Sequence, residues 1–166
     1  KLLLLLQTSP KCSIYTAEAL AIYKSVQNII INKETSHNKY LILSDSLSSL
    51  TGINNLTNPS DISKLIHEKT YELSKKGIGI SFLWIPGHCG IGGNELADQE
   101  ASKAASSTDT HILNFSTYTD LKKLIQTILY HKWQIHWTKQ NTKLNTIKNN
   151  IQVWRNPGLN RKDETT

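Results

Sequence analysis

Methionine is absent from the 166-residue sequence, which has only two cysteines. Cys12 and Cys89 lie far apart and form no CxxC pair, so the sequence contains no zinc finger and gives little support for a disulfide framework. We therefore expect a reducing intracellular setting, nuclear or cytoplasmic. Because the chain does not begin with methionine, we interpret it as an excerpt of a longer protein.

Long apolar runs and several common catalytic motifs are also missing. Leu2–Leu6 is far shorter than the ~20 residues of a membrane span, so we expect no membrane partner and interpret the run as a buried strand. The segment GIGGN at residues 90–94 lacks the Lys-Ser/Thr pair of a Walker loop, and no GxSxG elbow occurs. The sequence therefore gives no support for a P-loop nucleotide site or a serine hydrolase.

The net charge of +6 is concentrated near the C-terminus. Residues 1–106 hold 10 lysines and 9 acidic residues, whereas residues 130–166 hold 7 basic and 2 acidic residues. Basic segments favour phosphate backbones, although a lysine-rich segment can equally be a solvated face. We divide the chain into a domain at residues 1–106 and a helical, basic extension at residues 107–166.

Apolar periodicity predicts an α/β protein in which strands alternate with helices. Strands are predicted at Leu2–Leu6, Tyr40–Ser44 and Gly79–Ile85, and helices from Thr16, over Ser46–Ile53, from Ser60 or Asp61 to Lys76, over Asn94–Ala105, over Ser116–Gln140 and over Leu144–Trp154. Loops are predicted at Gln7–Ser13 and Ser106–Asn114. Strands separated by helices predict parallel pairing, and the lack of strict alternation predicts a sheet covered on both faces. In such sheets, functional groups collect beyond the carboxyl ends of the strands.

Three acids lie at the predicted element boundaries. Asp45 ends a strand, Asp98 lies one turn into a helix, and Glu18 lies near the start of another helix. Each can have a purely structural role, such as capping or a favourable interaction with the helix dipole. Clustered together, they would repel one another unless a cation lay among them, and hard oxygen ligands favour Mg²⁺ or Mn²⁺.

Several other side chains near these acids are candidates for the same site. His88 lies on a glycine-rich loop, where an imidazole can move a proton, or it is simply a surface histidine. Asn94 either contacts a phosphate or caps a helix, and Glu95 either supports the acids or supplies a first-turn charge. Ser46, directly after Asp45, is a further candidate for substrate binding.

Three motifs in this order, AEALAI (Ala17–Ile22), LSDSLSSL (Leu43–Leu50) and WIPGHCGIGGNELAD (Trp84–Asp98), carry a family resemblance. Together they resemble the ribonuclease H domain of non-LTR retrotransposon reverse transcriptases. The resemblance implies a five-stranded mixed sheet flanked by helices. It also implies endonucleolytic cleavage of the RNA strand of an RNA–DNA hybrid with two Mg²⁺ ions, for which Mn²⁺ can substitute.

The same resemblance assigns roles to individual residues. Glu18, Asp45 and Asp98 would bind the metal ions, and His88 would be the auxiliary histidine of the loop. The reverse transcriptase domain of the same polyprotein would be a partner, and we expect the chain to be a monomer.

The sequence departs from the family at its start. The family opens with a strand that bears the first catalytic aspartate, whereas residues 1–17 contain no Asp or Glu. We therefore expect the first strands to be missing, and the excerpt to be weakly folded and to have little activity. Two alternatives remain open: a non-catalytic nucleic-acid-binding remnant of such a domain, and an integrase or transposase core, against which the loop around His88 argues.

Overall fold

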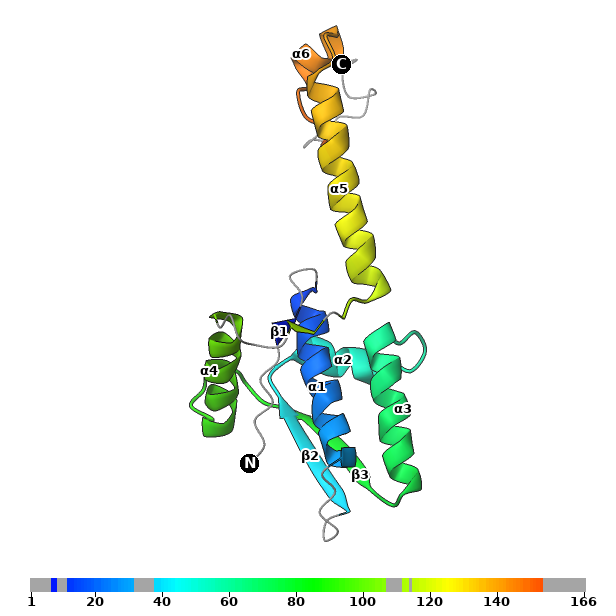
Figure 1. Ribbon diagram of the computed structural model, residues 1–166, viewed down its shortest axis with the longest axis vertical. Helices are drawn as coiled ribbons and strands as arrows, with labels where there is room; N and C mark the ends of the chain where they lie inside the picture. The colour runs from blue at the N-terminus through cyan, green and yellow to red at the C-terminus, as the bar shows by residue number, and fades with distance from the viewer. Residues whose placement is uncertain (1–6, 9–11, 32–37, 107–111, 114, 154–166) are drawn as a thin grey trace, which may run out of the picture. The chain divides into compact units, whose positions relative to one another are not determined.

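A computed structural model of the chain describes residues 7–8, 12–31, 38–106, 112–113 and 115–153. The chain divides into two compact units, residues 1–121 and 122–166. The elements labelled in Figure 1 are β1 (Gln7–Thr8), α1 (Ile14–Ile31), β2 (Lys39–Ser44), α2 (Leu47–Asn54), α3 (Asp61–Lys75), β3 (Gly79–Trp84), α4 (Gly92–Ser106), β4 (Ile112–Leu113), α5 (Tyr118–Thr138) and α6 (Lys143–Ile147). The predicted strand at Leu2–Leu6 and residues 156–166 lie outside the described residues.

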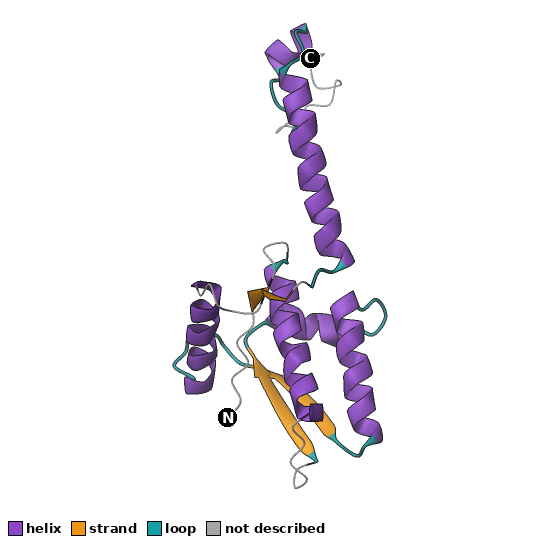
Figure 2. Cartoon of the chain, viewed as in Figure 1, coloured by secondary structure: helices purple, strands orange, loops and turns teal. Residues whose placement is uncertain are grey.

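The α/β class is confirmed, because a small parallel sheet is flanked by helices (Figure 2). Strands β2 and β3 pair in parallel from Lys39 opposite Gly79 to Ser44 opposite Trp84. The prediction of loops on either side of this core was wrong in part, because β1 and β4 form a second parallel pair within the segments predicted as loops. Among the described residues all strand pairing is parallel, so the antiparallel strands implied by the family resemblance are not found there.

The sheet formed by β2 and β3 is covered on one face within the structure. Tyr40, Ile42, Ile80 and Phe82 pack against the cluster of Val26, Leu73 and Ile78. On the opposite face, about half of the surface of Leu41, Leu43 and Leu83 is exposed. The expectation of a sheet covered on both faces therefore fails for the described residues, although all of these strand positions are apolar.

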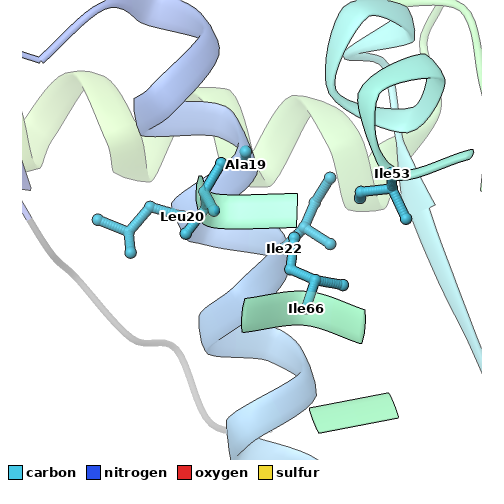
Figure 3. Packing of buried hydrophobic residues seen from close by; sticks show 6 residues of the cluster. Ala19, Leu20, Ile22, Ile53 and Ile66 are labelled. Carbon is cyan, nitrogen blue, oxygen red and sulfur yellow. The ribbon is translucent and has the colours of Figure 1, made fainter. Parts of the chain in front are cut away.

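The core of the first unit joins α1, α2 and α3. Its fully or nearly buried side chains, several of which are labelled in Figure 3, are Ala19, Leu20, Ile22, Ile53, Ile62 and Ile66. Along α1, the buried residues Ala19, Ile22 and Val26 recur at three- and four-residue steps, which places them on one face of that helix. Their burial holds α1 and α3 side by side (Figure 1), and α1 carries Glu18.

Local signals explain where α3 begins and ends. Ser60 caps its N-terminus by accepting a hydrogen bond from the backbone N–H of Ser63. At its C-terminus Gly77 has φ 75°, and the N–H groups of Gly77 and Ile78 donate to the carbonyls of Ser74 and Leu73. This arrangement is a Schellman motif, which needs a residue with positive φ and so favours glycine. Both predicted ends of the helix are confirmed.

A capping box at the start of α5 is a feature that the sequence analysis missed. The Thr117 hydroxyl and backbone N–H both donate to Oδ2 of Asp120, whose own N–H donates to Thr117 Oγ1. Oδ1 of Asp120 also accepts from the backbone N–H of Ser13, just before α1. Burial raises the pKa of Asp120, but hydrogen bonds from Thr117, Thr16 and Ser13 outweigh this and lower it from 3.8 to about 2.

We expect Asp120→Asn to destabilise the protein at pH 7, because the carboxylate accepts more hydrogen bonds than the amide oxygen. The lowered pKa corresponds to a loss of about 2 kcal/mol in the free energy of unfolding. A folded-state pKa below the unfolded one stabilises the protein above pH 3.8, and this stabilisation is lost as the pH falls towards 2. Urea denaturation should therefore show a difference at pH 7 that closes near pH 2.

The control for this prediction is Glu72→Gln, which removes partly exposed ion pairs with Lys69 and Lys76. This control should change stability much less, since exposed ion pairs contribute little. A difference between the wild type and Asp120→Asn that stays constant from pH 7 to pH 2 would contradict the role of the carboxylate.

In the second unit, α6 and the described residues after it, up to Val153, fold back against the end of α5 (Figure 1). Trp137 Nε1 donates to the carbonyl of Lys148 at 2.8 Å, and Gln134 bonds the backbone of Asn149 and Ile151. The prediction of a helix over Leu144–Trp154 was too long, because α6 ends at Ile147 and the next residues satisfy their backbone groups with these side chains. Among the described helices, none is both long and apolar enough to cross a membrane.

Candidate active site

The candidate site lies at the carboxyl ends of β2 and β3, as the parallel pairing predicts. The last residues of the two strands, Ser44 and Trp84, are partners in the register, and the N–H of Ile85 donates to the Ser44 carbonyl. The Trp84 indole N–H also donates to the backbone carbonyl of Asp45 at 3.1 Å. The first residue after β2 is thereby held against the start of the loop that carries His88.

The carboxylate of Asp45 is positioned by two segments that are distant in sequence. Its Oδ2 accepts a hydrogen bond from the side-chain amide of Asn94 in α4 at 3.1 Å. It also lies against Gly87, where an added Cβ would come within 2.8 Å of the same oxygen. Asn94 is not the cap of α4, since that helix begins at Gly92, so its side chain is available to orient Asp45.

Glu18 approaches the same edge of the sheet from α1. One of its carboxylate oxygens accepts a hydrogen bond from the hydroxyl of Ser46, the residue next to Asp45. Ser46, rather than Asp45, caps α2 by accepting from the backbone N–H of Ser49. This cap frees the Asp45 carboxylate from the structural role considered for it, and it leaves the buried Ser46 hydroxyl engaged within the protein.

A second group of side chains forms where the loop meets α4. The possible ligand atoms of His88, Glu95 and Asp98 all lie within 4.8 Å of one another. Among the described residues, these three side chains are close enough together to hold a metal ion. Nδ1 of His88 is 3.2 Å from Oδ2 of Asp98, and Glu95 accepts a hydrogen bond from the Gly90 N–H. The loop is tightly turned, since His88 has φ 54° and Gly90 φ 75°.

The donor atoms at this site fit a divalent cation. Oδ2 of Asp98 is buried and accepts no hydrogen bond, although His88 lies close to it. A buried carboxylate oxygen without a donor is costly unless a cation satisfies it. Asp45 and Glu18 present further carboxylates, which are oxygen ligands of the kind that Mg²⁺ and Mn²⁺ prefer.

The structure brings together some of the predicted site residues and leaves others apart. Asp45 contacts Asn94, Glu18 contacts Ser46, and His88, Glu95 and Asp98 form one group; Glu18 and Asp45 are not members of that group. From the sequence, Glu95 was expected either to support the acids or to supply a first-turn charge. Its place three residues before Asp98, on the same side of one helix turn, is the signal by which it could have been joined to His88 and Asp98.

The fold and this site define an α/β protein with a carboxylate-rich site at one edge of a parallel sheet. A family model described as RNase H matches residues 5–106, so the chain belongs to the RNase H family. The α/β architecture is consistent with an RNase H-like fold, and the match spans every candidate site residue from Glu18 to Asp98. No match was found among curated proteins or among solved structures.

The close approach of Gly87 to Asp45 leads to a specific prediction. We expect Gly87→Ala to push the Asp45 carboxylate away from its place and to lower Mn²⁺ affinity about tenfold, as displaced metal-site partners commonly do. Isothermal titration of Mn²⁺ into the folded protein would measure the effect.

The matched control is Gly93→Ala, because no atom lies within 4 Å of a Cβ added there. This substitution lies in the first turn of α4 and adds only a methyl group to the helix. Equal Mn²⁺ affinity in Gly87→Ala and Gly93→Ala would show that the contact at Gly87 does not position the carboxylate.

Proposed function

We propose that this chain hydrolyses the RNA strand of RNA–DNA hybrids endonucleolytically, as the ribonuclease H domain of a retrotransposon reverse transcriptase. Membership in the RNase H family supports RNA-strand hydrolysis in general. The observation that carries the proposal further is the position of Asp45 beside the His88 loop, at the adjacent carboxyl ends of two parallel strands. The motifs around Glu18, Asp45 and Asp98 support the retrotransposon relationship by resemblance.

In this proposal Glu18, Asp45 and Asp98 hold two divalent metal ions, Mg²⁺ or Mn²⁺. When bound, such ions activate water and neutralise charge on the scissile phosphodiester. Asn94 keeps the Asp45 carboxylate oriented through its hydrogen bond to Oδ2. His88, whose side chain is 83% exposed and whose Nδ1 lies beside Asp98, would be the auxiliary histidine of the site.

The remaining predicted residues act on or around the substrate. Glu95 holds the loop through the Gly90 N–H, and with it the position of His88. Asn94 and Ser46 lie beside the two carboxylates that they bond, so a bound phosphodiester backbone would pass next to them. We propose recognition of the hybrid through its backbone and 2′-hydroxyl groups rather than through base edges.

We expect the 166-residue chain to cleave hybrids slowly, because it lacks one of the carboxylates that the family uses. Residues 1–17 contain no acid, so the chain supplies three of the four carboxylates that the family resemblance implies. We therefore expect slow cleavage that depends on Mn²⁺ or Mg²⁺. A chain extended upstream by a strand that bears an aspartate should cleave faster.

The test is cleavage of an RNA–DNA hybrid labelled on each strand, with and without Mn²⁺ or Mg²⁺. The proposal predicts cuts in the RNA strand only, with the DNA strand and free single-stranded RNA left intact. The alternative function is a non-catalytic remnant that binds nucleic acid, which the lack of an acid in residues 1–17 favours. Binding of the hybrid without cleavage, by both the 166-residue chain and the extended chain, would establish that alternative.

A further inference from the structure

The second unit has an unusual charge distribution. From Lys122 to Val153 the chain contains no Asp or Glu. The same stretch carries six lysines, namely Lys122, Lys123, Lys132, Lys139, Lys143 and Lys148. All of them except the partly buried Lys148 are exposed. The charges of the five exposed lysines are not neutralised by acids of this stretch, so its surface attracts anions.

The same unit contains a preformed aromatic pocket where α5 meets α6. The pocket has a volume of about 260 Å³ and is lined by Trp133, Trp137, Leu144, Lys148, Asn150 and Ile151. Its walls are held in place, because Trp137 bonds the Lys148 carbonyl and Gln134 bonds the backbone on either side of Asn150. Trp133 remains 65% exposed, so a flat aromatic surface faces solvent at the pocket.

We propose that this pocket and the exposed lysines near its lining residues in the sequence, Lys132, Lys139 and Lys143, bind single-stranded nucleic acid. An unstacked base would stack on Trp133, and the flanking phosphates would contact the lysines. A base inside a duplex is covered on both faces by its neighbours, so Trp133 can stack only on a base of a single strand. This site would be separate from the carboxylate site of the first unit and does not depend on the proposed nuclease activity.

The arrangement of side chains on α5 argues against a lipid surface as the partner. Helices that lie on membranes present a continuous apolar face opposite a basic face. On α5, Lys132 lies four residues after Ile128 and three before Ile135, in the middle of the exposed apolar stripe. Lys132 thus interrupts the apolar stripe next to Trp133, which favours a strand with both phosphates and bases over a lipid surface.

The test measures binding of the whole 166-residue chain to a fluorescein-labelled 20-nucleotide oligouridylate. Fluorescence anisotropy is recorded without divalent metal, so that hydrolysis does not interfere, and at two salt concentrations. We expect Trp133→Ala to weaken binding about tenfold or more, whereas Trp133→Phe should retain most of the affinity. We expect Lys143→Gln to lower the salt dependence of binding, since it removes one phosphate contact.

The matched control is Lys64→Gln, which removes the same charge from an exposed position on α3 in the first unit and should leave oligouridylate binding unchanged. Circular dichroism confirms that each variant is folded. Unchanged binding by Trp133→Ala would overturn the proposal, as would tighter binding to vesicles of phosphatidylcholine and phosphatidylserine than to the oligonucleotide. Because the assay contains no metal, its outcome is independent of whether the chain cleaves hybrids.

Discussion

Replacing Asp45 with asparagine is expected to lower hybrid cleavage at least about 100-fold and to weaken Mn²⁺ binding by a similar factor. The substitution keeps the size of the side chain and removes the negative charge that a metal ion needs. Asp45 is also the acid at the end of β2 whose carboxylate is oriented by a partner from α4. Two readouts are informative here, because Mn²⁺ affinity can be measured even if cleavage by the 166-residue chain is slow.

Substitution of Asn94, the hydrogen-bond partner of Asp45, should cause a smaller loss than substitution of Asp45 itself. Asn94→Ala removes the hydrogen bond to Oδ2 and leaves the carboxylate charge in place. A loss of about tenfold is expected, since residues that orient a metal ligand commonly contribute that much. Equal losses in Asp45→Asn and Asn94→Ala would indicate that Asn94 contacts the metal ion or the substrate directly. Wild-type Mn²⁺ affinity in Asp45→Asn would contradict the placement of a metal ion at this carboxylate.

Much of the site could be predicted from the sequence, because its position follows from strand direction. Two apolar strands separated by helices predict parallel pairing, and parallel strands bring their carboxyl ends to one edge. Asp45 and the His88 loop are therefore neighbours in the structure although the chain separates them widely. The ends of α3 were equally predictable, since Ser60 and Gly77 act through local geometry alone.

Features that depend on distant partners could not be predicted in the same way. The pairing of β1 with β4 joins two-residue strands from opposite ends of the first unit, and strands of that length carry no periodicity. The capping box of Thr117 and Asp120 has a local sequence signal, but its bond to Ser13 is a tertiary contact. The choice between Asp45 and Ser46 as the cap of α2 also depended on tertiary context, because Ser46 bonds Glu18 at the same time.

The position of Glu18 depends on the hydrophobic core, because the core holds α1, the helix that carries Glu18, in place. Ile66 of α3 is fully buried against the α1 side chains (Figure 3). We expect Ile66→Ala to lower the free energy of unfolding by about 3 kcal/mol, through lost burial and the cavity left behind, and Ile66→Val to lower it by about 1 kcal/mol. Urea denaturation at pH 7 measures both values.

Comparing stability with Mn²⁺ binding in the same variants distinguishes residues that pack the core from residues that bind the metal ion. Ile66 makes no contact that would place it in the candidate site, so cleavage and Mn²⁺ binding should be unchanged at a low temperature at which Ile66→Ala remains folded. Asp45→Asn should show the reverse pattern, with little change in stability and a large loss of metal affinity. If Ile66→Ala instead weakened Mn²⁺ binding while fully folded, Glu18 would be positioned chiefly by the packing of α1 on α3. Its hydrogen bond to Ser46 would then be a consequence of that packing rather than the cause of its position.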